Sequence, residues 1–124
     1  MIGLGVDLVD LGRFAGVLER RANFITRVYT PSERDYCEQA KGPMKRVERY
    51  AARFAAKEAA MKALGVGLGS FGFHDVEVDR AESGDPALIL RGKAAAVAAE
   101  RGATSWHVSL SHSETVAIAV VAVE

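Results

Sequence analysis

The sequence predicts an α+β fold, with an antiparallel sheet, a block of helices and one long central helix. The chain opens and closes with apolar runs rich in Ile, Leu and Val, at residues 1–9 and 116–123, as expected of buried strands. Residues 46–64 predict one long helix, because they are rich in strong helix formers and contain no proline. Strands and helices that follow one another in blocks are typical of the α+β class.

The first half of the chain is predicted to be a strand followed by helices. After the strand at residues 1–9, Asp10 can cap a helix that runs to about residue 21. Residues 30–33 begin another helix, with proline at the first helical position and a glutamate that completes a capping box. Gly42 and the proline after it end that helix, and the long helix follows.

The second half is predicted to carry the remaining strands. It begins with a glycine-rich loop, residues 65–72. Turn residues and alternating apolar positions then divide it into short elements. They are a strand at 73–78, a hairpin turn at 82–85, a strand at 86–90, a helix at 92–101, and strands at 106–110 and 116–123 around a turn at 112–114.

Composition indicates an ordinary globular protein. The 124 residues fit one domain, residues 1–124, with 49% hydrophobic and 26% charged residues. The formal net charge is zero, so nothing global indicates nucleic-acid binding. The single cysteine, Cys37, excludes an intrachain disulfide and fits the reducing cytoplasm. No segment resembles a signal peptide or a membrane span.

Glu58 and Lys62 are the first candidate functional pair. At about 100° per residue they share one side of the long helix with Phe54 and Met61. Burying charge is costly unless it meets a metal, a counter-ion or a charged ligand. The alternative is a surface pair at i,i+4, which stabilises a helix by about 0.2–0.5 kcal/mol. Helix statistics alone favour this alternative.

Asp7 favours a functional role for Glu58 and Lys62. It lies between two apolar residues of a predicted buried strand, where a carboxylate is costly unless it bonds to backbone N–H groups or to a ligand. Asp7 and Glu58 as two oxygen ligands, with Lys62 nearby, suit Mg²⁺ that holds a phosphate.

Two loops are further candidates for phosphate binding. The glycine-rich loop from Gly65 follows a helix instead of opening one, so it has neither Walker nor Rossmann geometry, and a helix cap explains it equally well. Ser111 and His112 end a strand and could meet a phosphate at its tip. A Ser-His hydrolase is disfavoured, because adjacent side chains point to opposite faces and no Gly-x-Ser-x-Gly elbow is present. Three histidines and one cysteine also lack zinc-ligand spacing.

A basic cluster lies in and after the first predicted helix. It either forms a solvated helix face or receives an acidic protein through electrostatic steering. Its members are Arg13, Arg20, Arg21 and Arg27.

Together these motifs resemble the holo-[acyl-carrier-protein] synthases, the small stand-alone phosphopantetheinyl transferases. Residues 5–9 (GVDLV), followed by Arg13, match the Gly-x-Asp motif of that family. Residues 53–59 (RFAAKEA) with 62–65 (KALG) match its Lys-Glu-Ala helix. The resemblance spans essentially the whole chain and implies the phosphopantetheinyl transferase fold.

The resemblance implies a transfer of the phosphopantetheine arm of coenzyme A to a serine of apo acyl-carrier protein. Asp7 and Glu58 would bind Mg²⁺, and the metal would bridge the pyrophosphate of coenzyme A. Lys62 would stabilise charge on the phosphate under attack or on the leaving group. Lys57 would contact phosphates or a neighbouring strand. Either a metal-bound water or Glu58 would take the serine proton.

The resemblance also implies an assembly. Small members of the family are trimers with sites between subunits, so we expect a homotrimer in which Ser111 and His112 serve the site of a neighbouring subunit. The arginine cluster would receive the acidic helix of the carrier protein. The competing class is a non-catalytic oligomeric module that binds coenzyme A or a carrier protein, although such a module has little need for Asp7 and Glu58 beside anionic phosphates.

Overall fold

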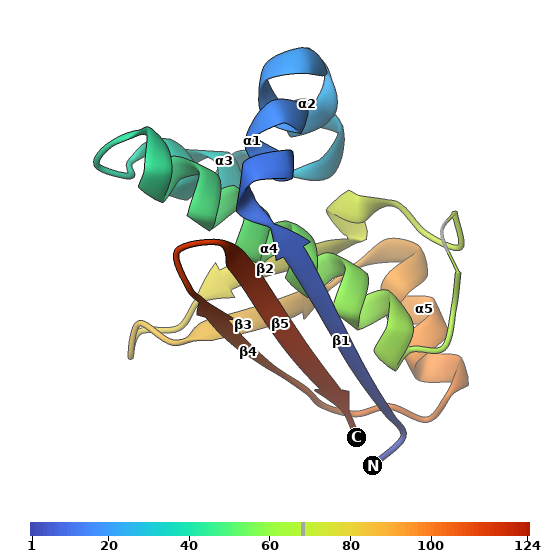
Figure 1. Ribbon diagram of the computed structural model, residues 1–124. Helices are drawn as coiled ribbons and strands as arrows, with labels where there is room; N and C mark the ends of the chain where they lie inside the picture. The colour runs from blue at the N-terminus through green and yellow to red at the C-terminus, as the bar shows by residue number, and fades with distance from the viewer. Residues whose placement is uncertain (68) are drawn as a thin grey trace.

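Two antiparallel sheets and one long helix organise the chain in the computed structural model, which describes residues 1–67 and 69–124 (Figure 1). The first sheet has three strands in the order β1-β5-β4, and the second pairs β2 with β3. The strands are β1 (Gly3–Asp10), β2 (Val76–Arg80), β3 (Pro86–Leu90), β4 (Trp106–His112) and β5 (Val116–Val123). The helices are α1 (Leu11–Arg20), α2 (Phe24–Val28), α3 (Pro31–Glu38), α4 (Pro43–Ala63) and α5 (Gly92–Glu100), with a 3₁₀ turn η1 (Phe73–Asp75).

Helix α4 is the centre of the molecule. It packs along β1 and β5 on one face of the three-stranded sheet, while β2 and β3 lie on its other side (Figure 1). Seven of its alanines are buried, and their small side chains let the sheet approach the helix closely. They are Ala51, Ala52, Ala55, Ala56, Ala59, Ala60 and Ala63.

The two faces of the three-stranded sheet differ. The face toward α4 is buried through alternate residues such as Val9, Ala119 and Val121. The opposite face carries Leu4 and Leu8, which are 62% and 59% exposed. These leucines pair across the ladder with Ala122 and Ile118 of β5. The part of this face formed by β1 and β5 is therefore apolar and uncovered in the single chain, whereas β4 contributes the polar Ser109 and Ser111 to it.

Most element predictions are confirmed, and the chemistry of their ends explains why. The Asp10 side chain accepts a hydrogen bond from the Arg13 N–H and caps α1. Thr30 and Glu33 form the predicted capping box of α3. The predicted α+β class is confirmed, with the difference that the strands divide into two sheets joined by a hydrogen bond from Trp106 Nε1 to the Leu88 carbonyl, 2.9 Å.

Three local features differ from the predictions. Pro43 opens α4 instead of ending the helix before it, which stops at Glu38. Residues 73–75 form the 3₁₀ turn η1 instead of the first half of a strand, and the hydrogen bond from the Asp75 N–H to the Gly72 carbonyl closes that turn. Helix α2 was not predicted, because five residues are too few to show a helical period. Phe24 on α2 packs at 5.6 Å, centroid to centroid, from both Phe14 of α1 and Phe54 of α4. These rings fix both short helices against α4.

Candidate functional site

Asp7, Glu58 and Lys62 come together where β1 crosses α4. Lys62 Nζ lies 3.2 Å from Asp7 Oδ1 and donates to the Val6 carbonyl at 3.0 Å. Asp7 and Glu58 line one depression of about 440 Å³, together with Arg13 and Phe54. The depression is open to solvent and combines an apolar wall with the carboxylates of Asp7 and Glu58 and with Asp10, whose side chain caps α1.

Glycine brings the strand close enough to the helix to make this contact. A Cβ on Gly5 would overlap the carbonyl oxygen of Ala59, and one on Gly3 would overlap that of Ala63. Because β1 can approach α4 this closely, Asp7 meets Glu58 and Lys62, which the i,i+4 spacing places on one side of the helix. The Gly-x-Asp motif is therefore a packing requirement as well as a chemical one.

The electrostatics of Glu58 suit a cation. Burial, and then the charge of Asp7, raise the pKa of the Glu58 carboxyl, while Lys62 opposes the shift. In residues 1–67 and 69–124, no group of three or more His, Cys, Asp and Glu side chains lies together. A metal here would use two carboxylates and draw its other ligands from water and substrate, which is how Mg²⁺ is commonly bound. The residues therefore fit this ion.

Lys57 requires a correction, because it cannot contact a phosphate in this fold. Its side chain is fully buried and its ammonium group is saturated by the carbonyls of Phe73 and Val76 and by Glu33 Oε1, 2.8 Å away. Lysine has three N–H donors, so none is left for a ligand. Of the two partners predicted for Lys57, the structure shows the neighbouring strand, through Val76 of β2.

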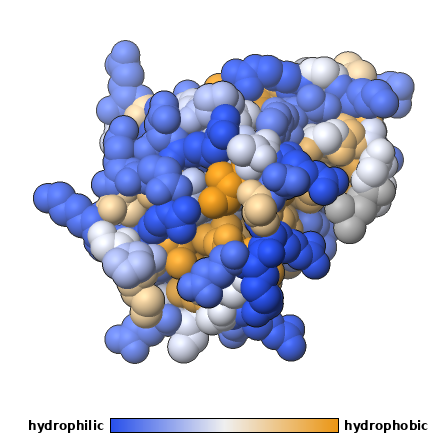
Figure 2. Space-filling model, turned by 90° about the horizontal axis from the view of Figure 1, so that it is seen from above, coloured by the Kyte–Doolittle hydropathy of each residue, from blue (hydrophilic) through white to orange (hydrophobic). Residues whose placement is uncertain are grey.

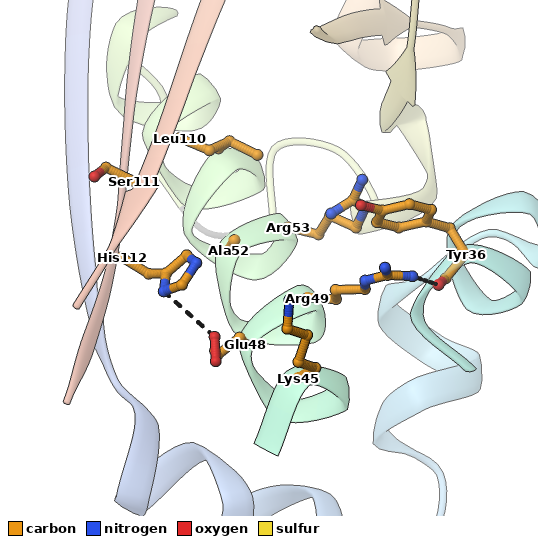
Figure 3. Close-up of a pocket in the computed structure, with 9 residues that line it drawn as sticks. All are labelled: Tyr36, Lys45, Glu48, Arg49, Ala52, Arg53, Leu110, Ser111 and His112. Carbon is orange, nitrogen blue, oxygen red and sulfur yellow. Dashed lines mark hydrogen bonds and ion pairs between the residues drawn. The ribbon is translucent and has the colours of Figure 1, made fainter. Parts of the chain in front are cut away.

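A second feature, which the sequence analysis missed, is a basic cavity between α3, α4 and the end of β4 (Figure 3). Its volume is about 240 Å³, and its cations are Lys45, Arg49 and Arg53. Arg53 is only 5% exposed, and its Nε has no hydrogen-bond partner among the described residues. The guanidinium groups of Arg49 and Arg53 each lie 4.1 Å from the centre of the Tyr36 ring. A buried guanidinium with an unpartnered nitrogen, beside the half-buried Arg49 and the exposed Lys45, indicates an anion site.

The signal for this cavity was present in the sequence. Lys45, Arg49 and Arg53 follow one another at intervals of four residues, which places them in one row along a helix. Such a row is usually a solvated face, and only the packing of Tyr36 and β4 against it makes it a cavity.

The two residues at the end of β4 point in different directions. His112 faces the cavity, and its Nδ1 lies 3.3 Å from Glu48 Oε2 (Figure 3). The Ser111 hydroxyl points away from His112, toward the exposed face of the sheet (Figure 3). Within one chain, only His112 of this pair joins the basic cavity through its side chain.

The carboxylates and the basic cavity lie on opposite flanks of α4. Glu58 and Arg49 are nine residues apart, so at about 100° per residue they point in opposite directions. The depression that contains Glu58 and the cavity that contains Arg49 share no lining residue. A helix with its side chains is about 10 Å across, so the body of α4 separates the two.

The remaining predicted site residues lie around the edges. Gly65 ends α4 in a left-handed conformation, φ 70°, and its carbonyl faces the Arg101 guanidinium at 3.4 Å. Arg13 lines the depression of the carboxylates, and Arg21 and Arg27 line a hollow of about 540 Å³ beside α2. Seen from the end that carries α1 and α2, the surface is largely hydrophilic with hydrophobic residues near its centre (Figure 2).

No helix in the described part of the chain is both long enough and apolar enough to cross a membrane.

The chain is similar to known proteins along nearly its whole length. The sequence model of the 4′-phosphopantetheinyl transferase superfamily matches residues 3–121. A holo-[acyl-carrier-protein] synthase from Koribacter versatilis is 45% identical, over 100% of this chain and 98% of the relative. The solved synthase from Neisseria meningitidis superposes with a TM-score of 0.87 at 31% identity, over 100% of this chain and 98% of that one.

A second solved structure includes a ligand. It is a holo-(acyl-carrier-protein) synthase from Bacillus anthracis in complex with CoA (3′,5′-ADP), with a TM-score of 0.81 and 35% identity over 98% of this chain and 95% of that chain. The sequence matches in each of these comparisons, and the fold matches in both solved structures. The chain therefore belongs to the 4′-phosphopantetheinyl transferase superfamily, among its holo-[acyl-carrier-protein] synthases.

Proposed function

We propose that this protein transfers the 4′-phosphopantetheine arm of coenzyme A to a serine of an apo acyl-carrier protein and releases adenosine 3′,5′-bisphosphate. The observation that carries the proposal is the meeting of Asp7 and Glu58 at one solvent-open depression, with Lys62 Nζ 3.2 Å from Asp7 Oδ1. The relatives named above, which match along the full chain, support the same reaction.

In this reaction the serine oxygen attacks the phosphorus that carries the pantetheine arm. The bond from that phosphorus to the bridging oxygen breaks, and the leaving bisphosphate keeps the electron pair. Lys62 uses one N–H on Asp7 and one on the Val6 carbonyl, so its third N–H can donate to a phosphate oxygen. Glu58, whose pKa is raised by burial and by Asp7, can accept the serine proton.

Asp7 and Glu58 would hold Mg²⁺, which would supply electrostatic stabilisation of charge on the phosphates. The chain itself positions the carboxylates through the glycine contact between β1 and α4. Lys62 adds a fixed positive charge on the same flank of the helix.

The nucleotide end of coenzyme A would bind in the basic cavity. Lys45, Arg49 and Arg53 present three positive charges there, and one of them is buried without a counter-ion. A guanidinium group can donate two parallel hydrogen bonds to two oxygens of one phosphate. A bound phosphate would therefore satisfy the Arg53 nitrogen that has no partner.

The site would be completed between copies of the chain, in a homotrimer. The pyrophosphate of coenzyme A is attached to the same ribose as its 3′-phosphate, so one ligand cannot reach around α4 from the cavity to the carboxylates. A neighbouring copy supplies the missing half. The uncovered sheet face, with Leu4, Val6 and Leu8 at least half exposed, is a surface that such an assembly would bury.

The arginine cluster would dock the carrier protein. Arg13 lies at the depression of the carboxylates, and Arg21 and Arg27 lie at the neighbouring hollow with the apolar Phe24 and Phe73. Basic groups around an apolar centre suit an acidic amphipathic helix. We propose the cytoplasm as the location, since the one cysteine is a buried free thiol.

Mass spectrometry tests the reaction directly. An apo carrier protein incubated with coenzyme A, Mg²⁺ and this protein should gain about 340 Da, the mass of the arm, with the metal supporting the transfer. Asp7→Asn should bind adenosine 3′,5′-bisphosphate normally and transfer nothing. If the unaltered protein binds coenzyme A but modifies none of several carriers, the non-catalytic binding module is the correct function.

A further inference from the structure

Glu48 is an acidic residue in a cavity built from cations. It lies on the first half of α4, between Lys45 and Arg49 in sequence, and lines the same cavity as both (Figure 3). A carboxylate at this place repels the anion that the cavity would bind. Its presence therefore needs a specific reason.

The Glu48 side chain contacts His112 in preference to its basic neighbours. Its carboxylate is 19% exposed, and in the described part of the chain its ion-pair partner is His112, with 3.3 Å between Oε2 and Nδ1. The usual partners on a helix surface are a Lys or Arg three or four residues away. Here Lys45 is available at that spacing, and the structure instead pairs Glu48 with a residue of β4.

The contact with Glu48 fixes which nitrogen of the His112 ring carries the hydrogen. Nδ1 of His112 lies near two oxygen acceptors, Glu48 Oε2 and the Ser113 carbonyl at 3.4 Å. Both contacts are attractive only when Nδ1 carries the hydrogen. The ring is then held with Nε2 away from Glu48, and the His112 side chain remains 56% exposed for a ligand.

We propose that Glu48 is a positioning residue for nucleotide binding: it orients His112, so that Nε2 meets a phosphate group of coenzyme A in the basic cavity. Nε2 can donate to a phosphate oxygen only in the ring that carries both hydrogens, in which Nδ1–H donates to Glu48 at the same time. Carboxylates orient metal-binding histidines in the same way, through the ring nitrogen that faces away from the ligand. The inference rests on the proposed function, since it assumes that the nucleotide end of coenzyme A occupies this cavity.

The proposal and its alternative predict effects of opposite sign. If Glu48 acts only as a negative charge near an anion, its removal strengthens nucleotide binding. If it acts through His112, its removal weakens binding as long as His112 is present. Once His112 is replaced by alanine, only the repulsion remains, and removing Glu48 can then no longer weaken binding.

The test is calorimetric titration with adenosine 3′,5′-bisphosphate. We expect Glu48→Gln and His112→Ala each to weaken binding about tenfold, the usual effect of losing a hydrogen bond to a charged group. In the His112→Ala background, Glu48→Gln should leave the affinity unchanged or increase it. Glu114→Gln, which removes a charge two residues after His112, is the matched control and should have no effect. Unfolding temperatures verify that each variant is folded.

A spectroscopic measurement separates positioning from a merely structural role. Long-range ¹H–¹⁵N spectra of the His112 ring should show hydrogen on Nδ1 in the unaltered protein and a mixture of tautomers in Glu48→Ala. The proposal is overturned if Glu48→Gln strengthens binding in the presence of His112, or weakens it equally in its absence. If the unaltered protein binds adenosine 3′,5′-bisphosphate no better than adenosine, the assignment of the cavity fails instead, independently of Glu48.

Discussion

The ammonium nitrogen of Lys57 lies 2.8 Å from Oε1 of Glu33, and neither side chain is exposed to solvent. The pair joins α4 to the first turn of α3, where Glu33 also accepts hydrogen bonds from the N–H groups of Thr30 and Val78. Burial lowers the pKa of Lys57, while Glu33 opposes that shift. This pair belongs to the scaffold that holds α4 in place.

Replacing one partner of this pair should unfold the protein more easily. Lys57→Met leaves the Glu33 charge buried without compensation, so we expect a loss of about 3–5 kcal/mol in the free energy of unfolding. Urea denaturation followed by circular dichroism measures it. Lys62→Met, at a half-exposed lysine on the same helix, is the control and should change stability by less than about 1 kcal/mol while it abolishes transfer. Normal stability of Lys57→Met with weakened coenzyme A binding would restore Lys57 as a phosphate ligand.

A single methyl group at Gly5 should disturb both packing and the carboxylate site. The added Cβ would overlap the Ala59 carbonyl, so β1 must move away from α4 and take Asp7 with it. We expect Gly5→Ala to lose about 1–3 kcal/mol of stability and to weaken the binding of Mn²⁺, used as a spectroscopic substitute for Mg²⁺. Gly72→Ala meets nothing within 4 Å and has a negative φ, so it should behave like the unaltered protein. Equal effects of the two substitutions would contradict the close-approach argument.

The sequence predicted the elements whose ends carry specific chemistry. Asp10, Thr30 and Glu33 are capping residues whose hydrogen bonds are local, so the helix starts could be read within a few residues. Helix geometry alone placed Glu58 and Lys62 on one side of α4. The structure places Asp7 beside them, with Lys62 Nζ 3.2 Å from Asp7 Oδ1 and with Asp7 and Glu58 lining one depression, a proximity that the sequence alone could not show.

Tertiary contacts determine which charged side chains of α4 are buried and which line a cavity, and a local sequence pattern does not show this. Lys57 and Lys62 look alike in sequence, but one lies under β2 and the other at the surface. The basic row formed by Lys45, Arg49 and Arg53 became a cavity only because Tyr36 and the end of β4 close it. Both outcomes depend on segments far apart in the chain, which no local pattern specifies.

The raised pKa of Glu58 makes a prediction about pH. Folding raises this pKa, so the folded state favours the protonated carboxyl, and the stability that this provides is lost as the pH rises through the raised value. Glu58→Gln removes the cost of the buried charge. We expect the variant to unfold at a higher temperature than the unaltered protein at neutral pH, and the difference to vanish below about pH 4, where both side chains are neutral.

Adding Mg²⁺ should reverse the order of the two unfolding temperatures. Mg²⁺ binds the folded unaltered protein and raises its unfolding temperature with concentration, whereas Glu58→Gln should not respond. Thermal unfolding at several pH values, with and without Mg²⁺, measures both effects. If Glu58→Gln is less stable than the unaltered protein at neutral pH without metal, the Glu58 carboxylate makes a favourable contact in the folded state instead.

Reversing charge in the arginine cluster should affect the carrier protein alone. Arg13→Glu combined with Arg20→Glu places negative charge beside an acidic partner, so we expect the KM for the carrier to rise about tenfold or more, mainly through slower association. The KM for coenzyme A should stay constant. Lys93→Glu, an exposed charge reversal on α5, is the control. The defect should shrink at high salt, and an equal loss of affinity for coenzyme A would place the cluster in the nucleotide site.

The opposite directions of Glu58 and Arg49 allow a test of whether the site is shared between copies. Asp7→Asn damages the carboxylate half of the site, and Arg49→Ala damages the basic half, so each variant alone should be inactive. In an assembly with random mixing of equal amounts, roughly a quarter of the junctions combine an intact carboxylate half from one copy with an intact cavity from its neighbour. Co-expressed variants should therefore recover roughly a quarter of the activity.

A mixture of Asp7→Asn with Glu58→Gln is the matched control for this complementation. Both substitutions damage the same half of the site, so no junction in the mixture regains a complete carboxylate pair, and activity should stay absent. A site contained in one chain predicts no recovery in either mixture. Recovery in the first mixture and not in the second would follow only if Asp7 and Glu58 of one copy act together with the basic cavity of another, because α4 separates those groups within each chain.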